Sequence, residues 1–175
     1  MPDVFVFWLV PVSWVVHDVE ELLALPAWRR RNESALRRAA RWSSVTRRLV
    51  AAFPDSRGTF AVAATLVGLF LLGGTVAGVT DPRGVGLLVF AVCLGGYGLH
   101  GPVHVAQAAV FRGYVPGVVT AASLVVPTVA FVYWRLLDAG LLTPTTAGVT
   151  AAVGLLLFLP VVFVAGRLAD HLRTS

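Results

Sequence analysis

The sequence has no lysine, only one cysteine and few charged residues of any kind. Charged residues make up 13% of its 175 residues, whereas soluble domains carry about 25%, so we expect an integral membrane protein. Because Cys93 stands alone within an apolar run, neither a disulfide framework nor a cysteine-based metal site is available. All fourteen basic residues are arginines, and they gather beside apolar runs. Although the isoelectric point is near 10.6, this placement favours anionic lipid headgroups as partners rather than nucleic acid.

Apolar sequence is what the chain has in abundance. Hydrophobic residues account for 57% of it, and the mean hydropathy is +0.81. A membrane-spanning helix needs about 20 predominantly apolar residues. Five segments meet this requirement, namely residues 4–28, 59–80, 86–111, 115–134 and 145–167. The sequence therefore predicts an all-α fold, in which residues 1–175 form one membrane domain, a polytopic bundle of five transmembrane helices in a cell membrane.

The distribution of arginine predicts how the bundle is oriented. Residues 29–58, between the first two segments, hold nine arginines against only Glu33 and Asp55. The positive-inside rule places such a loop in the cytoplasm, so the N-terminus is expected outside and the C-terminus inside. Residues 34–53 of this loop alternate arginine with apolar side chains and could form an interfacial helix that contacts anionic lipid headgroups. The same arginines could instead act only as the signal that sets the topology.

A cluster of ionisable side chains interrupts the first apolar segment. It consists of His17, Asp18, Glu20 and Glu21. A charged group at such a depth in a bilayer costs a few kcal/mol, so intramembrane ionisable residues indicate function by default. On a helix, His17, Glu20 and Glu21 are spaced i, i+3 and i+4, which places them on one face. Asp18 points about 100° away from His17 and is the weakest candidate for a shared site.

A second polar stripe runs along the third apolar segment. It consists of Tyr97, His100, His104 and Gln107. The i, i+4 spacing of its two histidines lets two imidazoles on one helix face bind one metal ion. With a rise of 1.5 Å per residue, His17 and His100 are expected within about 2 Å of the membrane midplane, and Glu21 and His104 roughly 8 Å further inward. If the two helices are adjacent, both stripes meet in one buried cavity.

Three imidazoles and two carboxylates in one cavity suit zinc or another divalent transition metal. Catalytic zinc sites use three protein ligands and leave one position for water, and an uncoordinated carboxylate can act as general base on that water. The predicted metal ligands are His17, Glu21, His100 and His104, and the predicted catalytic groups are Glu20 and Glu21. We therefore expect a metal-dependent, zinc-like hydrolase that acts on a lipid or another membrane-embedded substrate.

Other functions agree with the same stripe. Histidine and glutamate chains also serve pumps and transporters, so the chain could be a small oligomeric proton-coupled carrier or permease in which Glu20 and Glu21 titrate. It could also be an accessory membrane subunit whose polar cluster contacts the helices of a partner. Finally, paired buried charges can serve only to set the register of two helices.

Three short motifs follow one another along the chain. They are His17-Asp18-Val19-Glu20-Glu21, His100-Gly101-Pro102-Val103-His104 and Tyr114-Val115-Pro116-Gly117. Together they resemble the HXXEE family of small prokaryotic integral membrane proteins. The first matches the motif that names the family, the second has His100 where that family usually has asparagine, and the third is similar to its aromatic-x-Pro-Gly motif. The resemblance implies a multi-span membrane protein with a polar site, but it names no reaction.

The third motif also predicts the start of a helix without any reference to a family. Proline is favoured at the first helical position, where its missing N–H is not needed, and Pro116 precedes an apolar segment. Just before it, Tyr114 could close the cytoplasmic mouth of the cavity. It could equally be an aromatic anchor at the membrane interface.

Overall fold

Helices dominate the residues described in the computed structural model, which are 4–42, 44, 47 and 56–174. In chain order they are α1 (Phe5–Trp42), α3 (Arg57–Thr80), α4 (Val85–Phe111), α5 (Val118–Thr120), the π-helix η1 (Ala121–Val125), α6 (Val126–Asp138) and α7 (Pro144–Thr174). No strand occurs among these residues, so the prediction of an all-α fold is confirmed.

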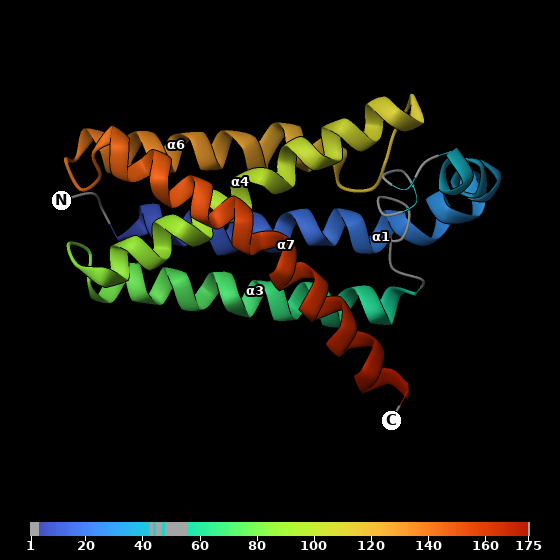
Figure 1. The fold of residues 1–175 in the computed structure, drawn as a ribbon, viewed down its shortest axis with the longest axis horizontal. Helices are drawn as coiled ribbons and strands as arrows, with labels where there is room; N and C mark the ends of the chain where they lie inside the picture. Colours follow the sequence, from blue (N-terminus) through green and yellow to red (C-terminus); the bar gives the residue numbers. More distant parts are fainter. Residues whose placement is uncertain (1–3, 43, 45–46, 48–55, 175) are drawn as a thin grey trace.

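The long helices alternate in direction. Figure 1 shows α1, α3 and α6 running along the long axis, with α7 crossing them obliquely. The N-terminus, the α3–α4 turn and the α6–α7 turn lie at one end, and the α4–α5 loop lies at the other. Because α3 returns the chain between them, α1 and α4 run in the same direction. The expectation that His17 and His100 lie at the same depth requires this arrangement.

Four helices are long and apolar enough to cross a membrane. They are Arg57–Thr80, Val85–Phe111, Val118–Asp138 and Pro144–Ala169. The last of these leaves large apolar side chains open, since Leu156 is 75% exposed and Phe163 is 62% exposed. Surfaces of this kind are rare on monomeric soluble proteins and are consistent with a membrane protein. The remaining predicted span, at the start of the chain in α1, is not among these four because charged side chains interrupt its apolar stretch. The number of spans and the orientation therefore stay predictions.

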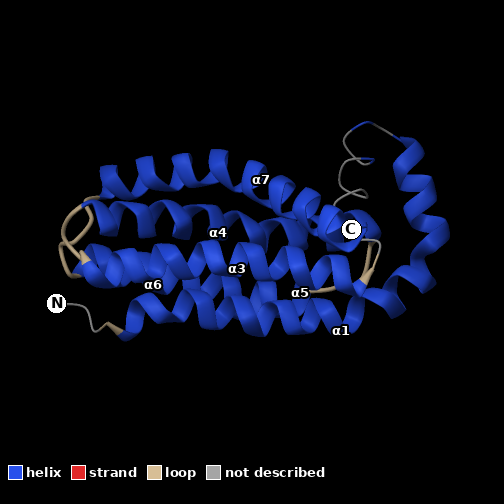
Figure 2. Cartoon of the chain, turned by 90° about the horizontal axis from the view of Figure 1, so that it is seen from below, coloured by secondary structure: helices blue, strands red, loops and turns tan. Residues whose placement is uncertain are grey.

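The first helix is longer than expected. We predicted a span ending near residue 28 followed by a basic loop, whereas α1 continues without a break to Trp42. Helix over this part is favoured because arginine, alanine, leucine and glutamate are good helix formers and Arg37 pairs with Glu33 one turn earlier; the cytoplasmic placement of residues 29–58 stays a prediction. Figure 2 shows this extension turning away from the other helices. The expected interfacial helix over residues 34–53 thus begins within α1, and most of its second half lies outside the described residues.

Glycines let α4 pack closely against its neighbours. A Cβ atom added to Gly154 of α7 would lie 2.1 Å from the carbonyl oxygen of Val92 in α4. On the other side of α4, a Cβ at Gly74 of α3 would lie 2.6 Å from the Cys93 sulfur. Small residues that bring backbones together are the usual contact between membrane helices. The backbones of α4 and its two neighbours therefore approach each other closely at these two contacts.

This packing makes a testable prediction about stability. We expect Gly154→Ala to lower the free energy of unfolding by about 1–3 kcal/mol, because the added methyl overpacks a contact with backbone atoms. Gly148→Ala on the same helix is the matched control, since nothing lies within 4 Å of a Cβ there. Alanine should be neutral or slightly stabilising at that position. Unfolding in mixed detergent micelles measures both, and equal stability of the two variants would contradict the close contact.

The rod formed by α5, η1 and α6 contains a local change of helix register. In η1 the backbone follows π-helical geometry, and the N–H of Val126 donates to the carbonyl of Ala121. Pro127 follows directly, and it has no N–H with which to continue the ordinary α-helical ladder. A π-helical turn often occurs at functional sites. Here it follows Thr120, whose side chain contacts α1.

Candidate metal centre

Four side chains from α1 and α4 meet inside the bundle. They are His17 and Glu21 from α1, and His100 and His104 from α4, and each offers one ligand atom within 4.8 Å of the others. The Nε2 atom of His100 lies 2.8 Å from that of His17 and 3.2 Å from that of His104. The predicted meeting of the two stripes is therefore confirmed for these four residues. Their role as metal ligands stays a prediction.

Glu21 lies beside the three imidazoles. Its Oε2 atom is 3.6 Å from Nε2 of His17, and its Oε1 atom is 3.7 Å from Nε2 of His104. The whole group is withdrawn from the surface, since His17 is fully buried and Glu21 is 8% exposed. A buried carboxylate is costly unless it is paired with a cation or neutralised by a proton. The cluster thus combines imidazole nitrogens and carboxylate oxygens that could hold a metal ion.

One turn toward the N-terminal end, α1 and α4 meet again through hydroxyl groups. The Ser13 hydroxyl lies 3.0 Å from that of Tyr97, and Tyr97 is fully buried. Nearby, the Trp14 ring lies 5.1 Å from the His100 ring, and its indole N–H donates to the carbonyl of Ala64 in α3. These contacts hold the two helices in register. Tyr97 therefore lies beside the four-residue cluster without belonging to it.

The other side of the cluster is covered by the loop that joins α4 to α5. The carbonyl oxygen of Pro116 lies 3.0 Å from Nδ1 of His104. A carbonyl can only accept a hydrogen bond, so Nδ1 of His104 must carry the proton. In the neutral ring, Nε2 then presents its lone pair to the other members of the cluster. Histidines that bind metals usually have this kind of partner at their second nitrogen.

Gly117 lies directly against the cluster. A Cβ atom at this position would be 2.8 Å from both Glu21 Cγ and His17 Cε1, and 3.0 Å from His104 Cε1. Its φ angle of 83° lies in the left-handed region that favours glycine. Two separate constraints therefore require glycine here. The sequence predicts a helix start at this Pro-Gly pair, but it does not indicate that the chain approaches the cluster so closely here.

Glu20 turns away from the cluster. Its Oε2 atom accepts hydrogen bonds from the Thr120 hydroxyl at 2.5 Å and from the Thr120 N–H at 2.8 Å. Its Oε1 atom accepts one from the Tyr114 hydroxyl at 2.9 Å. Thr120 in turn contacts Nδ1 of His17 at 2.8 Å. Sequence reasoning placed Glu20 at the common point and missed Thr120, because the rod after the third motif carries no visible polar stripe.

Tyr114 is a surface residue that is tied to the site. It is 47% exposed and lies between α4 and α5, outside both helices. Partial burial and its hydrogen bond to Glu20 raise the pKa of Tyr114 to about 12, so the hydroxyl stays a hydrogen-bond donor at neutral pH. Two roles were predicted for Tyr114, a cap over the cavity and an anchor at the membrane interface. The hydrogen bond indicates a third role, which is to hold Glu20 in place.

Gln107 and Asp18 lie near the site without joining it. Gln107 is buried on α4, and its Oε1 atom has no hydrogen-bond partner among the described residues. The Oδ1 atom of Asp18, on α1, is also buried and has no hydrogen-bond partner among the described residues. As expected from its direction on the helix, Asp18 is not a member of the metal-ligating group. The functional role predicted for Gln107 stays a prediction.

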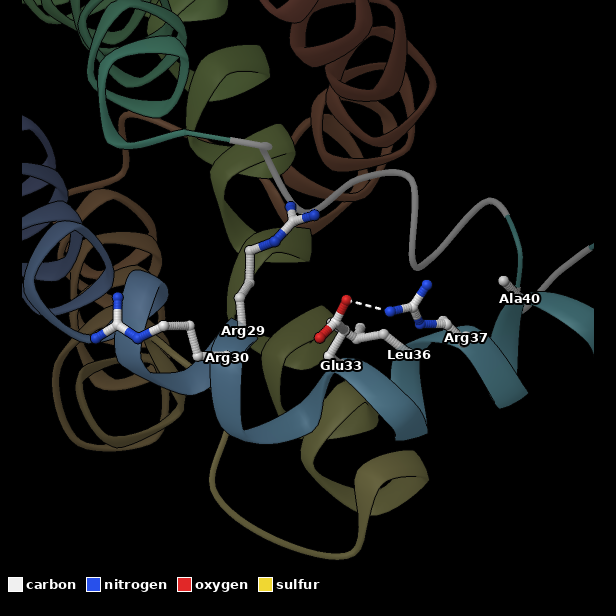
Figure 3. A pocket seen from close by; sticks show the side chains of 6 residues that line it. All are labelled: Arg29, Arg30, Glu33, Leu36, Arg37 and Ala40. Atoms are coloured by element: carbon white, nitrogen blue, oxygen red, sulfur yellow. Dashed lines mark hydrogen bonds and ion pairs between the residues drawn. The ribbon is translucent and has the colours of Figure 1, made fainter.

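The arginines after the first span form a second feature. Figure 3 shows a pocket on the C-terminal part of α1. It is lined by Arg29, Arg30, Glu33, Leu36, Arg37 and Ala40. Three of these are arginines, and one of them, Arg37, pairs with Glu33. Contact between this basic surface and anionic lipid headgroups stays a prediction.

The fold and the site together define a class of protein, a helical bundle of membrane type with a buried His/Glu group that could hold a metal ion. The family described as "Protein of unknown function with HXXEE motif" matches residues 8–132. This range covers more than half of the chain, so the protein belongs to the HXXEE family. The matched range includes all four cluster residues and Gly117. No curated protein and no solved structure matches the chain.

Proposed function

We propose that this protein is a multi-pass enzyme of the cell membrane that uses a bound zinc ion to hydrolyse a lipid. In this proposal α1 also crosses the membrane and brings the number of spans to five. The N-terminus lies outside and the C-terminus lies in the cytoplasm. The observation that carries the proposal is the meeting of three imidazole nitrogens and one carboxylate, from two helices, within 4.8 Å of one another.

The distances within the cluster support a tetrahedral ion. Zinc–nitrogen bonds of about 2.0–2.1 Å place neighbouring ligand atoms roughly 3.4 Å apart. The four measured separations in the cluster run from 2.8 to 3.7 Å and lie on both sides of this value. Because the whole group spans up to 4.8 Å, closing it around one ion needs the most widely separated ligand atoms to approach each other by about 1.4 Å.

The protons of the histidines also support a cation. A neutral imidazole carries at most one proton at Nε2, so His100 can donate to only one of its two neighbours. His104 already presents a lone pair, because its proton is held at Nδ1 by the Pro116 carbonyl. Without a positive charge, at least one pair of nitrogens at 2.8 or 3.2 Å is poorly satisfied. A metal ion accepts all three lone pairs at once.

Glu21 is the carboxylate best placed for the chemical step. Its oxygens lie 3.6 and 3.7 Å from Nε2 of His17 and of His104, so it stands next to the position that a zinc-bound water would take if only the histidines are ligands. We assign the three histidines as ligands and Glu21 as general base. Glu21 would take a proton from the water that attacks the carbonyl carbon, and return it to the leaving oxygen when the carbon–oxygen bond breaks.

The position of the cluster supports a lipid as substrate. Glu21 precedes Arg29 by eight residues on the same helix, which corresponds to about 12 Å of rise. The site therefore lies well below the basic end of α1, where we propose that anionic headgroups bind. A substrate that reaches it must enter from the hydrocarbon region, as an acyl lipid or another membrane-embedded ester does.

Removal of the metal tests the proposal. We expect the purified protein in detergent to carry about one zinc ion per chain, measured by elemental analysis. In vesicles that contain ester-linked and amide-linked lipids with labelled acyl chains, it should release labelled fatty acid. A chelator should abolish that release, and added zinc should restore it.

Two outcomes would overturn the assignment. A protein purified from zinc-supplemented cells that binds no transition metal would contradict the metal site. Zinc binding without hydrolysis of any lipid, combined with flux of protons or zinc into proteoliposomes, would favour the small oligomeric carrier instead.

A further inference from the structure

The two adjacent glutamates of the motif have opposite surroundings. Glu21 faces the three imidazoles, whereas Glu20 receives three hydrogen bonds from the segment between Tyr114 and Thr120. The two hydroxyl groups and the backbone N–H all act as donors to Glu20. A carboxylate that accepts from several donors is held in place, and Glu20 is not a member of the group that could hold a metal ion. Its hydrogen-bonded connection to the cluster passes through another residue.

That residue is Thr120, and the count of protons on its hydroxyl is decisive. A threonine hydroxyl has one proton to donate. The Glu20 oxygen lies 2.5 Å away and the Gly117 carbonyl lies 3.4 Å away, which is beyond the usual O–H···O range. The proton therefore goes to Glu20, and the Thr120 oxygen can only accept in its contact with Nδ1 of His17.

The proton of His17 is thereby fixed. Because Thr120 accepts, Nδ1 of His17 must carry the proton in the contact at 2.8 Å. Nε2 then presents its lone pair toward His100, 2.8 Å away. His17 and His104 thus have the same tautomer, one fixed through a side-chain relay and the other through the Pro116 carbonyl. Pro116, which fixes His104, lies in the loop between α4 and α5, and Thr120, which fixes His17, lies in the helical turn that follows this loop.

We propose that Glu20 and Thr120 form an outer relay that holds His17 in the tautomer and orientation required for binding a metal ion. Glu20 is then a positioning residue, and Tyr114 steadies its second oxygen. This inference rests on the proposed metal site, and it deepens that proposal. It also explains the spacing of the motif, in which the carboxylate at i+3 supports the histidine from outside and the carboxylate at i+4 faces the cluster.

A pair of substitutions at Thr120 tests the relay. Thr120→Val keeps the shape of the side chain but removes the hydroxyl, and we expect it to weaken zinc affinity by about 10–100-fold, as loss of an outer partner does. Thr120→Ser keeps the hydroxyl and should remain within about threefold of the unchanged protein. Ser123→Ala is the control, because its exposed hydroxyl bonds only to the Val119 carbonyl of its own helix. Zinc affinity is measured by competition with a chromophoric chelator.

A spectroscopic measurement separates this role from a merely structural one. Nitrogen-15 NMR of labelled histidine reports which ring nitrogen carries the proton. In the metal-free protein we expect His17 to be protonated at Nδ1, and in Thr120→Val we expect a mixture of both tautomers. Glu20→Gln provides a second variant if the valine does not fold, with an expected loss of about tenfold in zinc affinity.

The outcomes distinguish the relay from the metal site. If the unchanged protein binds no zinc, the proposed function fails, and the tautomer of His17 in the metal-free protein still decides about the relay. If zinc binds but Thr120→Val and Glu20→Gln bind it as tightly as the unchanged protein, the relay is wrong and the metal site stands. An Nε2-protonated His17 in the metal-free protein would also overturn the relay.

Discussion

Replacing His104 with alanine is expected to weaken zinc binding by more than about 100-fold. This histidine has both of its nitrogens committed, with Nδ1 on the Pro116 carbonyl and Nε2 at 3.2 Å from His100. Loss of an outer partner alone commonly costs 10–100-fold in metal affinity, so loss of a ligand should cost more. Metal content after dialysis against a weak chelator, together with competition titration, measures the effect.

A matched control is available within the chain. His171 lies on the exposed C-terminal part of α7, outside the metal-ligating group. We expect His171→Ala to keep the full zinc content. If both variants lose zinc to the same extent, the metal is bound elsewhere or nonspecifically, and the assignment of His104 is refuted.

Glu21→Gln is expected to separate metal binding from catalysis. Glutamine keeps the size of the side chain but cannot take a proton, and the loss of a general base typically costs about 10²–10⁴ in rate. With three histidines left as ligands, zinc should remain bound at nearly the original stoichiometry. Release of labelled fatty acid from lipid vesicles and zinc analysis on the same preparation measure the two properties.

The control for this variant is Glu33→Gln on the same helix. Glu33 is exposed, pairs with Arg37 and lies outside the group that could hold a metal ion, so its substitution should leave both zinc content and hydrolysis unchanged. A Glu21→Gln protein that loses zinc together with activity would show that Glu21 is a ligand and not a base. One that retains full hydrolysis would remove Glu21 from the mechanism.

The meeting of the two polar stripes could be predicted because it depends on simple regularities. Helical periodicity places His17 and Glu21 on one face, and the i, i+4 spacing does the same for His100 and His104. A constant rise per residue then assigns both pairs to the same depth. One condition remained open, namely that the two helices, which run in the same direction, also lie next to each other.

The opposite roles of Glu20 and Glu21 could not be predicted in this way. The two residues are neighbours on the helix, about 100° apart, and periodicity alone puts both on the polar face. What separates them is Thr120, which lies 100 positions further along the chain than Glu20. No rule of local sequence indicates that the turn after Gly117 brings this hydroxyl against α1.

The first helix illustrates a different limit. Its apolar part predicted a span, and the arginines that follow predicted a loop. A separate helix was expected from about residue 34, whereas α1 extends without a break to Trp42, because the residues between the predicted span and that helix are also mostly good helix formers. Charge distribution predicts which side of a membrane a segment faces, but it does not decide whether the backbone leaves the helix.

Composition and periodicity alone were enough to establish an all-α membrane-type chain with two polar faces, because both depend on residues that are close in sequence. The particular centre was decided by folding, which brought His17 to Thr120 across 103 positions and pressed Gly117 against three side chains of the cluster. The reason is that proton positions and ligand directions depend on contacts of a few ångströms. Only the packed chain sets such contacts.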